Sequence, residues 1–168
     1  FSVIFWVGGA VLLALLEWSN PRTMGGLSVP GKIMAALFQS VSTRTAGMNT
    51  IDLAACSPIS KLLMSVLQFI GAAPGSTGGG VKVTTFAVLI LTIRSVAQGR
   101  DDCVIGGHHI ESKTVYRALT IIVIGAVAAF GSAVVVYYNT AETVSVIDCI
   151  LESCSAFGTV GLSVDGIG

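Results

Sequence analysis

The stretch from Leu67 to Phe86, LQFIGAAPGSTGGGVKVTTF, interrupts an apolar helix with a glycine-rich turn. Pro74 removes a backbone donor, and the glycines between Gly75 and Gly80 relax the steric limits on φ, so a continuous helix cannot cross this point at low cost. A second apolar run begins at Phe86. The pattern therefore predicts a helix that breaks and then restarts.

A phosphate-binding loop is one alternative for this turn, because a Walker motif also combines glycines with a lysine. That motif requires Lys directly after its last glycine and then Ser or Thr. Here Val81 separates Gly80 from Lys82, and Val83 follows the lysine. In a bilayer, irregular backbone survives only where it lines a water-filled cavity or is buried in protein, so the break indicates a pore instead.

The composition of the 168 residues is that of a membrane protein. Hydrophobic residues make up 53% of the chain and charged residues 11%, whereas soluble domains carry about 25% charged residues. The formal net charge is zero and there is no basic cluster, which argues against nucleic acid as a partner. The four cysteines show no CxxC spacing and are interpreted as small buried residues. Because the chain begins at Phe1 without a methionine, we expect it to be part of a longer protein.

The lengths of the apolar segments separate spanning helices from short ones. Residues 1–18 and 116–138 can cross a bilayer, and residues 57–97 hold the broken helix. Residues 32–43 and 144–155 are too short to span and are predicted to be re-entrant. Asp148 supports this for the second, because it would cost about 2.5–3.5 kcal/mol at the centre of a lipid-facing helix. The polar residues 98–113 form the expected cytoplasmic loop.

The two short helices belong to an internal repeat. Gln39-Ser40-Val41-Ser42 matches Glu152-Ser153-Cys154-Ser155, and Thr45-Ala46-Gly47-Met48 matches Thr159-Val160-Gly161-Leu162, with one extra residue between the blocks of the second copy. The predicted fold is an all-α membrane protein with repeats of helix, re-entrant pore helix, filter loop and helix, in which one helix is broken by a Gly-rich intramembrane loop.

Such a repeat is typical of a cation filter. The negative end of a short helix stabilises a cation inside the membrane, and a Thr-x-Gly strand can aim successive carbonyls at a dehydrated ion. Glycine lets the backbone approach the ion without a Cβ in the way. The alternative is that Ser and Gly here only allow close helix packing.

Three motifs resemble the Trk/Ktr/HKT superfamily of potassium transporters, and most closely its KtrB-like membrane subunits. They are FQSVSTRTAGMNT (Phe38 to Thr50), GAAPGSTGGGVKVTTF (Gly71 to Phe86) and ESCSAFGTVGLS (Glu152 to Ser163). In that family four helix-loop-helix repeats surround one pore. The resemblance implies that residues 1–97 are the third repeat and that residues 114–168 are the fourth as far as its filter.

The resemblance also implies functional residues and partners. The first filter segment (residues 44–49) and the second filter segment (residues 157–163) would supply carbonyls to K⁺ from Thr45, Ala46, Gly47, Thr159, Val160 and Gly161. The gate loop, which must move for ions to pass, would comprise Gly75, Ser76, Thr77, Gly78, Gly79, Gly80 and Lys82. The expected partners are the remaining repeats, a second copy in a homodimer, membrane lipid and a KtrA-like cytosolic ring of nucleotide-binding subunits. K⁺, with Na⁺ as a further coupling ion, is expected without a covalent cofactor, in a multi-pass protein of the plasma membrane.

Two cations and one departure from the family pattern need an explanation. For Arg44, the sequence leaves open a structural partner such as Asp52 and a role in ion entry. Lys82 either reaches the cytosolic surface or pairs with groups that set the closed gate loop. Met48 stands where Phe is common in the family, which questions the packing behind the filter. Basic residues are equally numerous on the two sides of the membrane, so the orientation rests on the resemblance.

Two other classes of protein stay open on the residues alone. An intramembrane enzyme would use the Gly-rich break as an anion-binding turn and would depend on His108, His109 or Asp148. A non-conducting assembly module would tolerate bulky residues at Gly47 and Gly161. Because the sequence has no Ser-His-Asp set, paired acids or metal-ligand cluster, we expect no enzymatic activity.

Overall fold

The computed structural model describes residues 2–44, 46–71, 73, 75, 78–98, 104–105, 108–109, 112–140 and 144–164. The helices of this part are α1 (Ser2–Glu17), α2 (Val29–Ser42), α3 (Pro58–Phe69), α4 (Val83–Ala97), α5 (Ser112–Asn139) and α6 (Val146–Phe157). Strands β1 (Val104–Ile105) and β2 (His108–His109) pair antiparallel. The predicted helical class is confirmed, with this two-residue pairing added inside the expected 98–113 loop.

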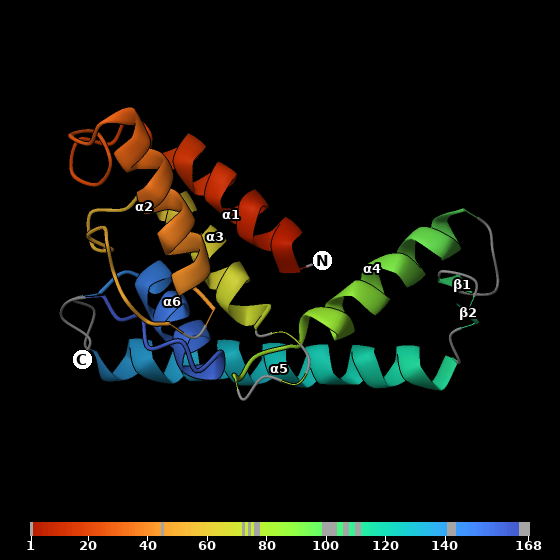
Figure 1. Ribbon diagram of the computed structural model, residues 1–168. Coiled ribbons are helices and arrows are strands. Elements are labelled where there is room, and N and C mark those ends of the chain that lie inside the picture. Colours follow the sequence, from red (N-terminus) through yellow and green to blue (C-terminus); the bar gives the residue numbers. More distant parts are fainter. Residues whose placement is uncertain are drawn as a thin grey trace.

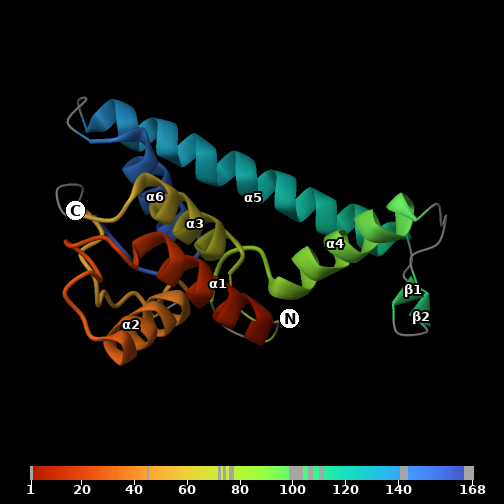
Figure 2. The same cartoon turned by 90° about the horizontal axis from the view of Figure 1, so that it is seen from above.

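Helices α1, α2, α3 and α6 lie together, and α5 runs along one side of them (Figure 1). α1 packs on α2 and α3, α3 packs on α6, and α6 packs on α5. α4 contacts α5 and leads away from the other helices, with β1 and β2 beyond its far end (Figure 2). The interruption predicted between residues 67 and 86 is present. The two halves of the broken helix, α3 and α4, diverge instead of continuing along one axis (Figure 1).

The helix starts follow from local capping chemistry. α2 begins at Val29, three residues before the predicted start, because Pro30 fits the first turn, where its missing N–H is not needed. Ser57 caps α3 by accepting a hydrogen bond from the Ser60 backbone N–H at 3.3 Å. Ser145 caps α6 in the same way, accepting from the Ile147 N–H at 3.4 Å. Each short helix therefore has a start fixed by residues next to it.

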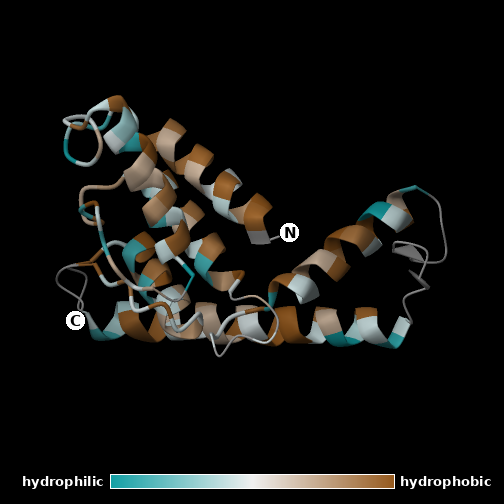
Figure 3. Cartoon of the chain, viewed as in Figure 1, coloured by the Kyte–Doolittle hydropathy of each residue, from teal (hydrophilic) through white to brown (hydrophobic). Residues whose placement is uncertain are grey.

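One helix of the described part, α5, is long and apolar enough to cross a membrane by its length and composition. Its 28 residues extend about 42 Å, against a hydrocarbon core of about 30 Å. Hydrophilic residues lie at its two ends and hydrophobic ones between them (Figure 3). The residues it buries are all small: Ala118, Gly125, Ala129 and Ala133. Its large aliphatic side chains therefore point outward, as in a helix that packs on neighbours through small residues.

Glu17, the last residue of α1, is fully buried and ties this helix to the start of α3. Its Oε1 accepts hydrogen bonds from the Ser57 backbone N–H at 2.9 Å and from the Ser60 hydroxyl at 2.5 Å. Its Oε2 accepts from the Asn20 amide at 2.6 Å and from the Thr23 hydroxyl at 2.7 Å. Four donors surround one carboxylate, so its negative charge is matched by protein groups instead of water.

We expect Glu17→Gln to lower the free energy of unfolding by about 1.5–3 kcal/mol, the usual value of hydrogen bonds to a charged group. The glutamine amide would also direct its own N–H groups at some of the four donors. Thermal unfolding of the purified full-length protein in detergent measures the change. Asp52→Asn is the matched control, since Asp52 is exposed and accepts one hydrogen bond, from the Ala54 N–H at 2.9 Å. Equal melting temperatures for the two variants would contradict the prediction.

A second buried charge contact joins α3 to α6. Lys61 Nζ lies 2.6 Å from Asp148 Oδ1, and the two side chains are 10% and 13% exposed. This ion pair explains how a charged residue is accommodated in α6. The sequence predicts that Asp148 is sheltered by protein, and the structure supplies the partner that the sequence could not name.

The cysteines of the described part are free and buried, as the sequence predicts: they are Cys56, Cys149 and Cys154. Burial raises the pKa of the Cys56 thiol to about 12, so this thiol stays protonated near neutral pH. Its Sγ donates to the Asp52 carbonyl at 3.3 Å. Cys103 lies outside the described residues.

Candidate functional site

The two predicted filter segments leave their helices through the same kind of turn. After α2, the Gly47 N–H donates to the Ser42 carbonyl at 3.3 Å. After α6, the Val160 N–H donates to the Ser155 carbonyl at 2.9 Å. In both cases the bond joins residues five apart, and the chain then continues without helical structure. The two turns therefore share a bond of the same span, although its donor is the repeat glycine, Gly47, in the first segment and the residue before the repeat glycine, Val160, in the second.

Gly47 and Gly161, the glycines of the two segments, are both left-handed, with φ of +66° and +84°. L-residues avoid this region, so the sequence needs glycine at both positions. A Cβ added to Gly47 would overlap the carbonyl oxygen of Val160. The structure thus brings together Gly47 of the first filter segment and Val160 of the second, which are far apart in sequence. Ala46 lies beside Gly47 and is exposed, and Thr45 lies outside the described residues.

In the second filter segment and at Val164, the residue after it, side chains alternate between core and surface. Val160, Leu162 and Val164 are buried, whereas Thr159 and Ser163 are exposed. The Val164 N–H donates to Glu152 Oε2 at 3.4 Å. The buried side chains fix this segment on the core, and the residues between them, Gly161 among them, are exposed.

The first filter segment is held through its backbone. The Ser42 hydroxyl accepts from the Met48 N–H at 2.9 Å and donates to the Met48 carbonyl. The Met48 side chain is 65% exposed, so it does not pack behind the segment. The sequence questions the packing of a methionine behind the filter. The structure shows that Met48 is held by the Ser42 hydroxyl, which bonds its backbone, and not by packing of its side chain. A cleft of about 210 Å³ lies beside the last residue of this segment, Asn49, and is also lined by Asp52 and by Ser163 of the second filter segment.

The glycine-rich loop closes on itself at its base. The Gly71 N–H donates to the Val81 carbonyl at 2.9 Å, and the Val81 N–H donates to the Phe69 carbonyl at 3.0 Å. These two bonds clip the end of α3 to the segment that enters α4. A Cβ at Gly71 would overlap the Gly79 carbonyl oxygen, so the two chain segments at this base, the neck of the loop, are as close as backbones can come.

The gate loop is also seated on the second filter segment. The Gly80 N–H donates to the Phe157 carbonyl at 3.1 Å, and the Gly79 N–H donates to the Thr159 hydroxyl oxygen at 2.7 Å. Gly75 and Gly80 have φ of +85° and +77°. Ser76 and Thr77 lie outside the described residues. The structure therefore brings part of the predicted gate loop into direct contact with part of the predicted filter.

Lys82 and Arg44 both point into protein. Lys82 Nζ donates to the Gly78 carbonyl at 2.7 Å, which is the loop-pairing alternative of the two that the sequence leaves open. The Arg44 guanidinium lies 5.2 Å from the centre of the Phe5 ring, and not beside Asp52. In the described part of the chain, Nε and Nη2 of Arg44 are buried without a hydrogen-bond partner.

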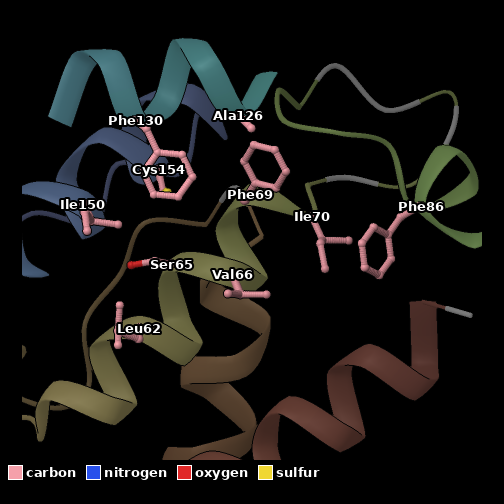
Figure 4. A pocket seen from close by; sticks show the side chains of 10 residues that line it. All are labelled: Leu62, Ser65, Val66, Phe69, Ile70, Phe86, Ala126, Phe130, Ile150 and Cys154. Carbon is pink, nitrogen blue, oxygen red and sulfur yellow. The ribbon is translucent and has the colours of Figure 1, made fainter. Parts of the chain in front are cut away.

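A second cleft, of about 400 Å³, opens between α3, α4, α5 and α6 (Figure 4). Phe69, Phe86 and Phe130 line it together with aliphatic side chains, and Ser65 contributes the one hydroxyl. A hydrated cation loses too much solvation in such a lining. This cleft is therefore a poor ion path, in contrast to the polar backbone of the two filter segments.

No group of three His, Cys, Asp or Glu side chains that could hold a metal ion occurs among the described residues. His108 and His109 form β2, opposite Ile105 and Val104. What the geometry does offer is two glycine-containing segments in contact, in which Ala46 and Gly161 are exposed, with a loop seated against one of them. Backbone carbonyls are ligands for alkali cations.

The chain belongs to a family of cation transport proteins. Residues 3–166 match the TrkH family, whose members are described as cation transport proteins. The family is one of transporters and not of enzymes, which agrees with the expectation from the sequence.

Three relatives narrow the comparison. The chain is 41% identical over 155 residues to the Ktr system potassium uptake protein B of Vibrio alginolyticus, and 33% identical over 150 residues to the protein of the same name from Bacillus subtilis. It is 31% identical over 165 residues to the potassium/sodium uptake protein NtpJ of Enterococcus hirae. The matches cover 92%, 89% and 97% of this chain but 34%, 33% and 36% of the relatives. The chain thus spans about a third of their length.

Proposed function

We propose that this chain forms part of the potassium filter of a membrane transporter. The filter carbonyls are those of Thr45, Ala46, Gly47, Thr159, Val160 and Gly161, which replace water around a dehydrated K⁺ ion. One observation carries the proposal: Gly47 approaches the Val160 carbonyl oxygen so closely that a Cβ would not fit. Each of the two segments contains a left-handed glycine, and the segments meet at one place. Two parts of a filter that surround one ion would have this arrangement.

The gate loop gives the pore a means of closing. It includes Gly75, Ser76, Thr77, Gly78, Gly79, Gly80 and Lys82, and its described part is clipped at its neck and seated on the second filter segment. Ions pass when it leaves this position. The Lys82 ammonium on the Gly78 carbonyl supports a role for this lysine in holding the loop, because the bond closes the loop across four residues.

The anion-binding alternative is disfavoured by where the loop N–H groups point. An anion site needs free donors. The N–H groups of Gly71, Gly79 and Gly80 already donate to the Val81 carbonyl, the Thr159 hydroxyl and the Phe157 carbonyl. The loop is therefore committed to protein acceptors in this part, and the transporter proposal is preferred.

Because the chain spans about a third of the length of these relatives, the proposal includes further parts of the transporter. The remaining repeats complete the filter, in a multi-pass protein of the plasma membrane surrounded by lipid. The relatives named as Ktr system proteins support a second component, for which we propose a KtrA-like ring of nucleotide-binding subunits on a homodimer. The relative named for potassium and sodium supports Na⁺ as a second ion.

Rubidium uptake by the full-length protein in a potassium-uptake-deficient cell tests the proposal. We expect Gly161→Ser to lower apparent rubidium affinity about 5- to 30-fold, because a side chain at φ +84° costs about 1–2 kcal/mol and forces the segment to change. Gly131→Ser in α5 is the control, since a Cβ there meets nothing within 4 Å. Unchanged affinity and selectivity, with the protein inserted, would leave the non-conducting assembly module as the better hypothesis.

A further inference from the structure

We propose that Thr159 is a positioning residue that couples the gate loop to the second filter segment through its hydroxyl group. This inference rests on the proposed function, and it goes beyond it: the proposed filter uses only the Thr159 carbonyl. The Thr159 side chain has a separate role: its hydroxyl makes the backbone conformation of the second filter segment depend on the position of the gate loop.

The backbone of Thr159 is in a conformation that its side chain disfavours. Its φ is +53°, and it is the non-glycine residue of the described part with positive φ. For a β-branched residue this region is a genuine outlier. Such a conformation persists only when neighbouring contacts hold it, and outliers of this kind gather at switch regions. The contacts of Thr159 are therefore the place to look for what maintains the segment.

The gate loop supplies those contacts. The Gly79 N–H donates to Thr159 Oγ1 at 2.7 Å, and the Gly80 N–H donates to the Phe157 carbonyl at 3.1 Å. A Cβ on Gly79 would lie 2.7 Å from the Phe157 carbonyl oxygen and 2.8 Å from Thr159 Cγ2. The loop fits here because residue 79 is a glycine. Its two consecutive N–H groups, those of Gly79 and Gly80, bind acceptors two residues apart in the second filter segment.

Movement of the loop changes the segment. When Gly79 and Gly80 withdraw, both hydrogen bonds break, and the left-handed turn at Thr159 loses its support. Its backbone then relaxes toward an ordinary region of φ, which reorients the peptide that leads into Val160. The contact exists only in the loop-seated state, so it provides the difference in interaction between two states that any coupling requires.

Thr159→Val tests the coupling in the full-length transporter, because valine keeps the β-branch and the backbone carbonyl but removes the acceptor. We expect the rubidium uptake rate to rise about 2- to 10-fold, as one hydrogen bond that holds the loop is lost. We also expect the preference for rubidium over sodium to fall. Thr159→Ser, which keeps a hydroxyl that can accept from the Gly79 N–H, should show a smaller change in both quantities than Thr159→Val. Thr120→Val is the control, since the exposed Thr120 hydroxyl only bonds the Tyr116 carbonyl of its own helix, at 2.8 Å.

Gly79→Ala tests the same contact from the loop side, and serves if Thr159→Val does not insert. It should raise uptake in the same direction, with Gly131→Ala as its control. If both act through one contact, the double variant should match either single variant, because there is one coupling to lose. Effects that multiply, or a Thr159→Val protein with wild-type uptake and selectivity, would overturn the inference. If Gly161→Ser still lowers rubidium affinity in that case, the coupling fails while the filter stands; if Gly161→Ser also changes nothing, the filter itself fails.

Discussion

Removing the charge of Lys61 alone is expected to destabilise the folded protein by about 3–5 kcal/mol, the usual cost of leaving a buried charge without its partner. Asp148 would then be an unpaired carboxylate that is 13% exposed, in a helix packed between α3 and α5. Removing the charge of Asp148 alone should cost a similar amount, since the Lys61 side chain is 10% exposed. The pair also joins the two predicted repeats, so its loss weakens the packing of α3 on α6.

Three variants separate the pair from its members: Lys61→Met, Asp148→Asn and the double variant. We expect each single variant to melt well below the wild type in detergent, and the double variant to recover most of the loss. Recovery is expected because two neutral groups carry no desolvation penalty for a lone charge. Lys113→Met, at an exposed position of α5, controls for loss of a lysine. Single variants that melt like Lys113→Met, or a double variant worse than both, would show that the ion pair does not support the fold.

The positions of the helices could be predicted because their signals are local. Pro and Gly mark the break before α4, a Ser-Pro pair starts α3, and the 21 uncharged residues from Ala118 to Tyr138 mark α5. The sequence predicts the start of α2 at Lys32 because the preceding residues form a loop signal, whereas the helix begins at Val29 because proline is compatible with a first helical turn. Such errors are small, since neighbours within a few residues decide each boundary.

The contacts that position the site could not be predicted, because their partners are distant in sequence. Lys61 and Asp148 are 87 residues apart, and Gly79 and Thr159 are 80 residues apart. A transfer free energy indicates that Asp148 needs shelter, but it cannot select Lys61 among the basic residues. The repeat likewise marks Gly47 and Gly161 as equivalent, and only the folded chain brings Gly47 to Val160. The sequence predicts a role for the Thr159 carbonyl, and no sequence signal points to its hydroxyl.

Gly47→Ser is expected to impair ion uptake more than any other single substitution considered for the filter. Two penalties combine at this position: φ is +66°, which costs an L-residue about 1–2 kcal/mol, and the new Cβ would overlap the Val160 carbonyl oxygen. The second penalty falls on backbone, which cannot swing aside as a flexible side chain can. We expect apparent rubidium affinity to fall by about 100-fold or more, or uptake to be lost with the protein still inserted.

The three filter and helix glycines form a graded series for this test. Gly161 has φ of +84° but nothing within 4 Å of an added Cβ, so Gly161→Ser carries the conformational penalty alone. Gly8 lies in α1, also with open space, so Gly8→Ser carries neither penalty. Rubidium affinity should therefore fall in the order Gly8→Ser, Gly161→Ser, Gly47→Ser. A side chain inserted between Gly47 and the Val160 carbonyl must displace the backbone of the filter and change the geometry that binds the ion. A Gly47→Ser protein that keeps wild-type affinity would therefore mean that this contact lies away from the ion.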